Sequence, residues 1–132
     1  MRIYGVLVLY NRFLNEVRAF EQLINSGITL IVCDNSTDET NNEETAKQNG
    51  AVYLSMHGNR GLSKAYNRAV TYILETFQPQ DEDLVCFFDD DTLIPTEYFH
   101  RLSEQDGDIV LPVVSDANGI MSPVKLRNKI VT

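Results

Sequence analysis

The chain opens with the apolar run Ile3-Tyr4-Gly5-Val6-Leu7-Val8-Leu9, and this stretch decides the fold. A run with no polar residue at alternate positions is typical of a parallel strand that is buried on both faces of a sheet. Such a strand needs paired strands on both sides and helices above and below it. We therefore expect Ile3–Leu9 to be the central strand of an α/β domain.

Strand and helix patterns alternate along the rest of the chain. Apolar residues recur at helical spacing from Leu14 to Ile24, and Gly27 is placed to end that helix. Further strands are predicted over 28–33, 51–56, 84–88 and 109–114 and from Ile120, and further helices over a polar segment ending at Gln48, over 62–77 and from Pro95. The alternation predicts a mostly parallel sheet flanked by helices, in which 84–88 is a further buried strand.

Length and composition favour one globular domain over residues 1–132. The hydrophobic share of 43% supplies enough apolar material for a core. The net charge of −8 argues against nucleic-acid binding. No apolar stretch reaches the roughly 20 residues that span a bilayer, and no secretory signal is visible, so we expect a cytoplasmic protein.

The cysteines and the basic C-terminal segment bear on where the protein is located. Cys33 and Cys86 lie in apolar runs without a Cys-x-x-Cys spacing, and we expect reduced thiols in the core. The last acidic residue is Asp116, and the cations that follow it are Lys125, Arg127 and Lys129. We interpret this basic tail as a solvated segment, with anionic lipid or phosphate as the alternative contact.

Polar clusters follow the predicted strands, where open α/β sheets bind ligands. They are Tyr10-Asn11, Asp34, the loop 58–64 and Asp89-Asp90-Asp91. Adjacent carboxylates repel, and a hard cation such as Mg²⁺ or Mn²⁺ would relieve that repulsion. In an extended segment Asp89 and Asp91 point the same way and Asp90 the other, so the outer two are candidate metal ligands. An acidic turn without a metal is the alternative.

The other clusters carry weaker signals. Asp34 is suited to accept hydrogen bonds from a nucleobase or ribose, and equally suited to cap the turn that follows it. The loop Gly58-Asn59-Arg60-Gly61 precedes a helix and offers N–H groups to phosphate. Its spacing matches neither a Walker loop nor a dinucleotide fingerprint, and such glycines also occur in ordinary loops.

Together these clusters resemble a family 2 glycosyltransferase of the GT-A fold, a Rossmann-like α/β architecture. The segments that carry the resemblance are Val6 to Asn11, Val32 to Asp38, Gly58 to Ala69 and Phe87 to Thr92. Their order and spacing both match, over residues 3 to about 115. Tyr10-Asn11, and the Pro95, Glu97 and Tyr98 that follow the aspartates, favour a bacterial rhamnosyltransferase-like branch.

The resemblance implies a nucleotide-sugar donor, a glycan or lipid-linked acceptor and a divalent metal, Mg²⁺ or Mn²⁺. It implies that Asp34 recognises the base and that the loop before the helix closes over the donor. It also implies that the aspartates form an Asp-x-Asp motif, which holds the ribose and the metal. The donor-binding residues implied are Tyr10, Asn11, Asp34, Asn59, Gly61, Lys64, Asp89 and Asp90, and the metal ligands are Asp89 and Asp91. The implied sheet order places the second and fourth strands on either side of the first.

The sequence departs from the family pattern after the fifth predicted strand. Family members continue into an acceptor-binding half that carries the catalytic base, and no residue here matches that base. We therefore expect residues 1–115 to be the donor-binding core and 116–132 the incomplete start of the acceptor side. An inverting enzyme would then bind donor through this chain without transferring sugar, and a full-length protein is compatible with peripheral attachment to the inner membrane face.

Two other functions stay open. A non-catalytic module would keep the nucleotide-sugar pocket without turnover. A phosphotransferase of the haloacid dehalogenase type is suggested by the segment from Phe87 to Thr92. That class requires Asp-x-Asp-x-Thr after its first strand, whereas Thr92 follows Asp91 directly.

Overall fold

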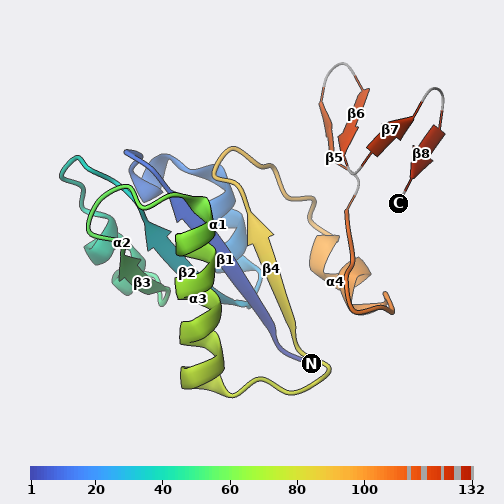
Figure 1. Cartoon of the computed structure of the whole chain (residues 1–132), viewed down its shortest axis with the longest axis horizontal. Coiled ribbons are helices and arrows are strands. Elements are labelled where there is room, and N and C mark those ends of the chain that lie inside the picture. The colour runs from blue at the N-terminus through green and yellow to red at the C-terminus, as the bar shows by residue number, and fades with distance from the viewer. Residues whose placement is uncertain (113, 117–118, 123, 127–128, 132) are drawn as a thin grey trace. The chain divides into compact units, whose positions relative to one another are not determined.

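The computed structural model describes residues 1–112, 114–116, 119–122, 124–126 and 129–131. The chain divides into two compact units, Met1–Thr96 and Glu97–Thr132. The strands of the first unit are β1 (Ile3–Leu9), β2 (Thr29–Asp34), β3 (Val52–Ser55) and β4 (Leu84–Phe88). They form one parallel sheet in the order β3-β2-β1-β4, with β1 inside it (Figure 1). The predicted α/β sheet, its central strand and its strand order are confirmed.

Three helices connect these strands: α1 (Arg18–Asn25), α2 (Asn42–Gln48) and α3 (Leu62–Phe77). Figure 1 shows α3 in front of the sheet and α1 behind it. The helix expected from Leu14 is divided, because the 3₁₀ turn η1 (Leu14–Glu16) precedes an extended Val17 and only then α1 begins. The Leu14 amide donates to Asn42 Oδ1 at 2.8 Å, so this first turn is held by α2. None of the described helices is long and apolar enough to cross a bilayer.

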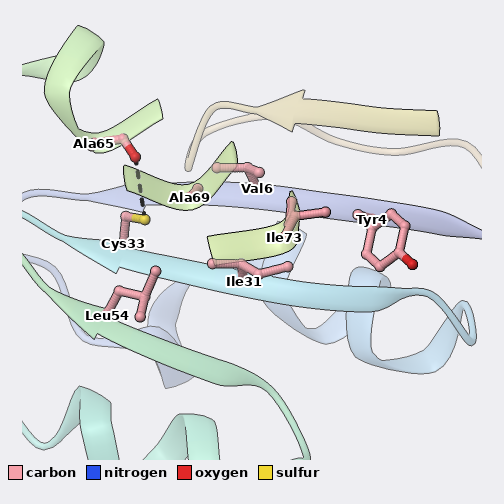
Figure 2. Close-up of a cluster of buried hydrophobic side chains, with 8 residues drawn as sticks. All are labelled: Tyr4, Val6, Ile31, Cys33, Leu54, Ala65, Ala69 and Ile73. Atoms are coloured by element: carbon pink, nitrogen blue, oxygen red, sulfur yellow. Dashed lines mark hydrogen bonds between the residues drawn. The ribbon is translucent and has the colours of Figure 1, made fainter. Parts of the chain in front are cut away.

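The main apolar cluster lies between α3 and the sheet (Figure 2). Its members are Tyr4, Val6, Ile31, Cys33, Leu54, Ala65, Ala69 and Ile73. The alanines of α3 allow close approach of the helix to the strands, and the Tyr4 ring packs on Phe77 with centroids 5.4 Å apart. Leu7 and Leu9 point to the other face by strand alternation and are also buried. Burial of a large aliphatic side chain such as Leu7 stabilises the fold by roughly 1.5–3 kcal/mol.

Strand β4 corrects the expectation that 84–88 is a buried strand. Among the described residues it pairs with β1 alone, so it forms an edge of the sheet. Val85 is exposed, and Phe87 is 47% exposed. The reason is that α3 packs against β1 and β2, while its Tyr66 ring meets Phe87 at a centroid distance of 4.5 Å.

The second unit holds α4 (Tyr98–Ser103) and the short strands β5 (Val114–Asp116), β6 (Gly119–Ser122), β7 (Val124–Leu126) and β8 (Lys129–Val131). β5 pairs with β6, and β7 with β8, both antiparallel. The predicted strand 109–114 is wrong, because 109–112 have no regular structure and Ile109 is 82% exposed. Pro112 supplies no amide donor, which disfavours pairing there. The strand expected from Ile120 lies within β6.

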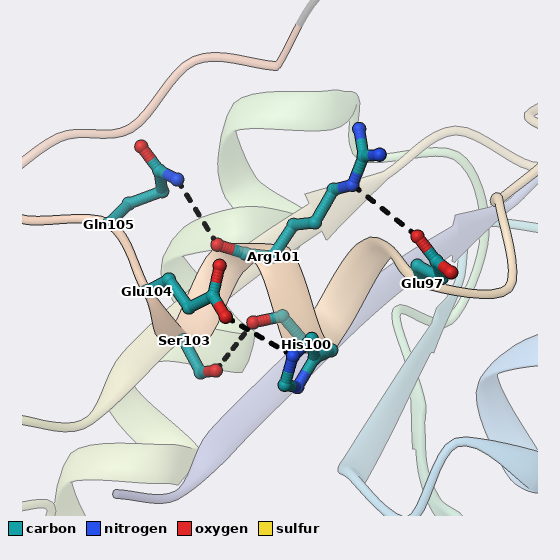
Figure 3. Close-up of polar contacts among 6 residues, drawn as sticks. All are labelled: Glu97, His100, Arg101, Ser103, Glu104 and Gln105. Atoms are coloured by element: carbon teal, nitrogen blue, oxygen red, sulfur yellow. Dashed lines mark hydrogen bonds and ion pairs between the residues drawn. The ribbon is translucent and has the colours of Figure 1, made fainter.

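Helix α4 carries an ion pair between Arg101 and Glu97 and a contact between His100 and Glu104, which is an ion pair only when the imidazole is protonated (Figure 3). His100 Nε2 lies 3.2 Å from Glu104 Oε1, and Arg101 Nε lies 3.6 Å from Glu97 Oε2. These side chains are exposed, so the Arg101–Glu97 pair is worth only about 0.3–0.5 kcal/mol. Pro95 precedes the helix by a short turn and does not occupy its first turn as expected.

Both cysteines are free thiols, as expected. Cys33 lies on β2 and Cys86 on β4, with β1 between them. Burial raises the pKa of each thiol to about 11. Cys33 is fully buried, whereas Cys86 is only half-buried because β4 is an edge strand.

We expect both thiols to react slowly with an alkylating reagent at about pH 8, and faster as the pH rises. The thiolate is the nucleophile, and a thiol with a pKa of about 11 is ionised to only about 0.1% at that pH. Iodoacetamide labelling followed by mass spectrometry measures the rates, with the urea-unfolded chain as control. Equal rates in the folded and unfolded chains would contradict the placement of both cysteines.

Candidate functional site

A cleft of about 390 Å³ opens at the carboxyl ends of the strands in the first unit. Its lining comes from the ends of β1, β2 and β4 and from the start of α3, and consists of Val8, Leu9, Tyr10, Asn35, Asn59, Leu62, Asp89, Asp90 and Asp91. This is the edge at which open α/β sheets bind ligands. The cleft therefore brings together five residues predicted from the sequence, namely Tyr10, Asn59 and the three aspartates.

The aspartates leave β4 in a turn, not in an extended segment. The Thr92 amide donates to the Asp89 carbonyl at 3.2 Å, so the expected alternation of side chains does not apply. Asp89 and Asp91 are exposed, and Asp90 pairs with Arg12. Solvent and the guanidinium thus relieve much of the repulsion that had suggested a metal. Among the described residues, no three His, Cys, Asp or Glu side chains converge as a ready cation site.

Asp34 does not line the cleft. It is 3% exposed, and its carboxylate accepts hydrogen bonds from the Ser36 amide at 3.0 Å, Asn42 Nδ2 at 3.1 Å and the Tyr53 hydroxyl at 2.8 Å. Burial and the hydrogen bond to Asp34 raise the pKa of the Tyr53 hydroxyl. The bond to Ser36 is the turn cap that the sequence offered as the alternative role of Asp34.

Asn35 lines the cleft, and sequence reasoning missed it. Its side-chain Oδ1 accepts from the Arg60 amide and its Nδ2 donates to the Gly61 carbonyl, both at 3.2 Å. Its own amide donates to the Leu9 carbonyl at 2.8 Å. Asn35 therefore ties the ends of β1 and β2 to the loop before α3. Strand alternation was the available signal, because Asp34 and Asn35 must point in different directions.

Asn11 fastens the end of β1 to the segment after β2. Its Oδ1 accepts from the amides of Thr37 at 2.8 Å and Asp38 at 3.0 Å, and its own amide donates to Ser36 Oγ at 2.8 Å. Its backbone has φ +50°, a conformation that asparagine tolerates better than most residues. Asn11 lies outside the cleft lining and orders the backbone next to Tyr10, which is exposed.

The loop before α3 is shaped by Asn59 and Gly61. Asn59 Oδ1 accepts from the Gly61 amide at 3.1 Å, and Gly61 has φ +87°, which disfavours any residue with a side chain. Lys64 is exposed in the first turn of α3. Gly61 and Lys64 do not line the cleft, whereas the exposed Leu62, which was not predicted, does.

Asn42, at the start of α2, is a second residue that sequence reasoning missed. It is 0% exposed. Its Nδ2 donates to the Arg12 carbonyl at 2.8 Å and to Asp34, and its Oδ1 accepts from the Leu14 amide at 2.8 Å. The side chain joins three segments behind the cleft, and nothing in a polar helical stretch distinguishes it from its neighbours.

Comparison with known proteins agrees with this arrangement. Residues 6–115 match the family described as Glycosyl transferase family 2. The chain is 30% identical over 102 residues to the dTDP-rhamnosyl transferase RfbF of Shigella flexneri, across 76% of this chain and 33% of that protein. The chain thus spans about a third of the length of this curated relative. No solved structure matches it.

Proposed function

The chain belongs to glycosyl transferase family 2, and from this premise we propose that it forms the donor site of an enzyme that moves a sugar from a nucleotide-diphosphate donor to an acceptor. One observation carries the proposal: the matched residues 6–115 contain every residue that lines the cleft. The parallel sheet is consistent with a GT-A fold. The family match argues against the phosphotransferase alternative, whose aspartates follow a first strand and not β4.

The chemistry of the cleft suits a nucleotide sugar. Tyr10 and Leu62 offer exposed apolar surface to the base or the deoxyribose. The exposed Asn59 offers an amide, which both donates and accepts hydrogen bonds. We propose that Asp34 and Asn35 serve base recognition by holding the loops around the cleft, since both side chains are buried and hydrogen-bonded within the fold. Lys64 and Gly61 would act when the loop closes over the donor.

A divalent cation fits the acidic end of the cleft. Asp89 and Asp91 present exposed carboxylate oxygens there, and such oxygens are the ligands that Mg²⁺ and Mn²⁺ prefer. We propose that these two side chains hold the metal. When bound, the metal would neutralise charge on the departing nucleoside diphosphate.

The relative that acts as a dTDP-rhamnosyl transferase makes dTDP-rhamnose the first donor to test. We propose an inverting reaction toward a glycan or lipid-linked acceptor, with the catalytic base supplied from outside residues 1–132. Cytoplasmic location, and peripheral membrane attachment of a longer protein, belong to the same proposal. The chain alone is then expected to bind donor without transferring sugar.

Thermal unfolding with a panel of dTDP-, UDP- and GDP-sugars, each in Mn²⁺ and in EDTA, tests the proposal. A donor at about 100 times its Kd stabilises the fold by about 2.7 kcal/mol. We expect dTDP-sugars in Mn²⁺ to raise the Tm most. Absence of a shift with every nucleotide would contradict the donor-site assignment, and turnover by a longer parent protein separates an enzyme from a binding module.

A further inference from the structure

Arg12 places a positive charge beside the acidic end of the cleft. Its Nη1 lies 3.3 Å from Asp90 Oδ1, and the two side chains are 39% and 26% exposed. Asp90 lines the cleft between Asp89 and Asp91. Among the described residues, Asp90 is the aspartate of this triplet that has an ion pair.

The position of Arg12 is fixed from inside the fold. The buried Asn42 side chain accepts from the Leu14 amide and donates to the Arg12 carbonyl, both at 2.8 Å. The same side chain is anchored to the Asp34 carboxylate. The backbone from Arg12 to Leu14 is therefore held by α2 at both of its ends. The guanidinium thus extends from an ordered segment and not from a free loop.

We propose that Arg12 is a positioning residue of the donor site, and this inference rests on the function proposed above. Its charge neutralises Asp90, which leaves Asp89 and Asp91 as the carboxylates available to a divalent cation. With a divalent cation bound, the cation, Asp89, Asp91 and the Arg12–Asp90 pair together carry no net charge. Without the guanidinium the same group would carry one net negative charge, which would repel the diphosphate of a donor. Arg12 thus gives the middle aspartate a role different from that of its neighbours.

The proposed role of Arg12 predicts opposite changes in the affinities for the cation and for the nucleotide, whereas a general loss of loop structure does not. Removing the Arg12 charge makes the acidic end of the cleft more negative, so a free divalent cation should bind more tightly. The same change removes attraction for a nucleoside diphosphate, which should bind more weakly. A single charge at close range in water changes an affinity by on the order of fivefold. A variant that merely loosens the loop would weaken both ligands.

Calorimetric titration of Mn²⁺ alone, and of dTDP in saturating Mn²⁺, tests the inference on the whole chain. For Arg12→Gln we expect the Kd of Mn²⁺ to fall about fivefold and the Kd of dTDP to rise about fivefold. Arg12→Lys should keep both values near those of the unmodified chain. Arg18→Gln, which removes an equally positive but exposed side chain from α1, should change neither.

Asp90→Asn is a second variant, for which we expect the opposite changes in the two Kd values. It releases Arg12 from its partner, so dTDP should bind more tightly and Mn²⁺ more weakly. If Arg12→Gln weakens both ligands, or leaves both unchanged, while the unmodified chain binds both, the inference is overturned and the proposed function stands. If the unmodified chain binds neither ligand, both are overturned.

Discussion

Replacing Asn42 by alanine is expected to lower the free energy of unfolding by about 3 to 5 kcal/mol. The Asn42 side chain is 0% exposed and makes hydrogen bonds to the Leu14 amide, the Arg12 carbonyl and the Asp34 carboxylate. Alanine leaves the Leu14 amide and the Arg12 carbonyl without this partner and removes one of the hydrogen bonds to Asp34, and each unsatisfied group costs roughly 1–3 kcal/mol. Urea denaturation followed by circular dichroism measures the loss.

The adjacent asparagine provides a matched control. Asn41 is exposed and precedes α2 without a side-chain capping bond. Asn41→Ala is therefore expected to change the stability by less than about 0.5 kcal/mol. Equal stability of the two alanine variants would show that the network behind the cleft does not hold its loops together.

Replacing Asp91 by asparagine is expected to weaken binding of dTDP in Mn²⁺ by at least about tenfold, since a charged metal ligand is lost. In EDTA, where the metal is absent, neither chain should bind dTDP measurably. The fold should stay intact or gain slightly in stability, because Asp91 is exposed and the repulsion from its acidic neighbours falls. Calorimetry measures the binding, and thermal unfolding measures the stability.

Asp81→Asn removes the same charge at the opposite end of β4. Asp81 is exposed and lies before the strand, away from the cleft lining. This variant should bind dTDP as the unmodified chain does. If Asp81→Asn and Asp91→Asn weaken binding equally, net charge and not metal ligation explains the effect. Unfolding of Asp91→Asn would assign that carboxylate a structural role.

The sheet could be predicted because its signals are local. Ile3–Leu9 is an uninterrupted apolar run, and the apolar stripe of 62–77 has the period of a helix, so both elements follow from sequence spacing. The division of the first helix could not be predicted, because it depends on a hydrogen bond from Leu14 to Asn42, distant in the sequence. The strand expected over 109–114 failed because an apolar run alone does not supply a paired strand, and Pro112 weakens it.

Part of the cleft lining could be anticipated, because strand ends can be located from the sequence. Tyr10, Asn59 and the aspartates follow predicted strands, and the structure places them in the lining, while their role in binding stays a prediction. The direction of each side chain at a strand end depends on the final register, which turns Asp34 inward and Asn35 toward the cleft. The ion pair between Arg12 and Asp90 joins segments far apart in the chain, so only the folded structure reveals it.

The most direct test of the central claim is a calorimetric titration of dTDP-rhamnose into this chain, once in Mn²⁺ and once in EDTA. A donor site built on Asp89 and Asp91 predicts saturable binding in Mn²⁺ that is lost in EDTA. Equal affinity in the two buffers would contradict the metal-dependent donor site, and absence of binding in both would contradict the donor site itself.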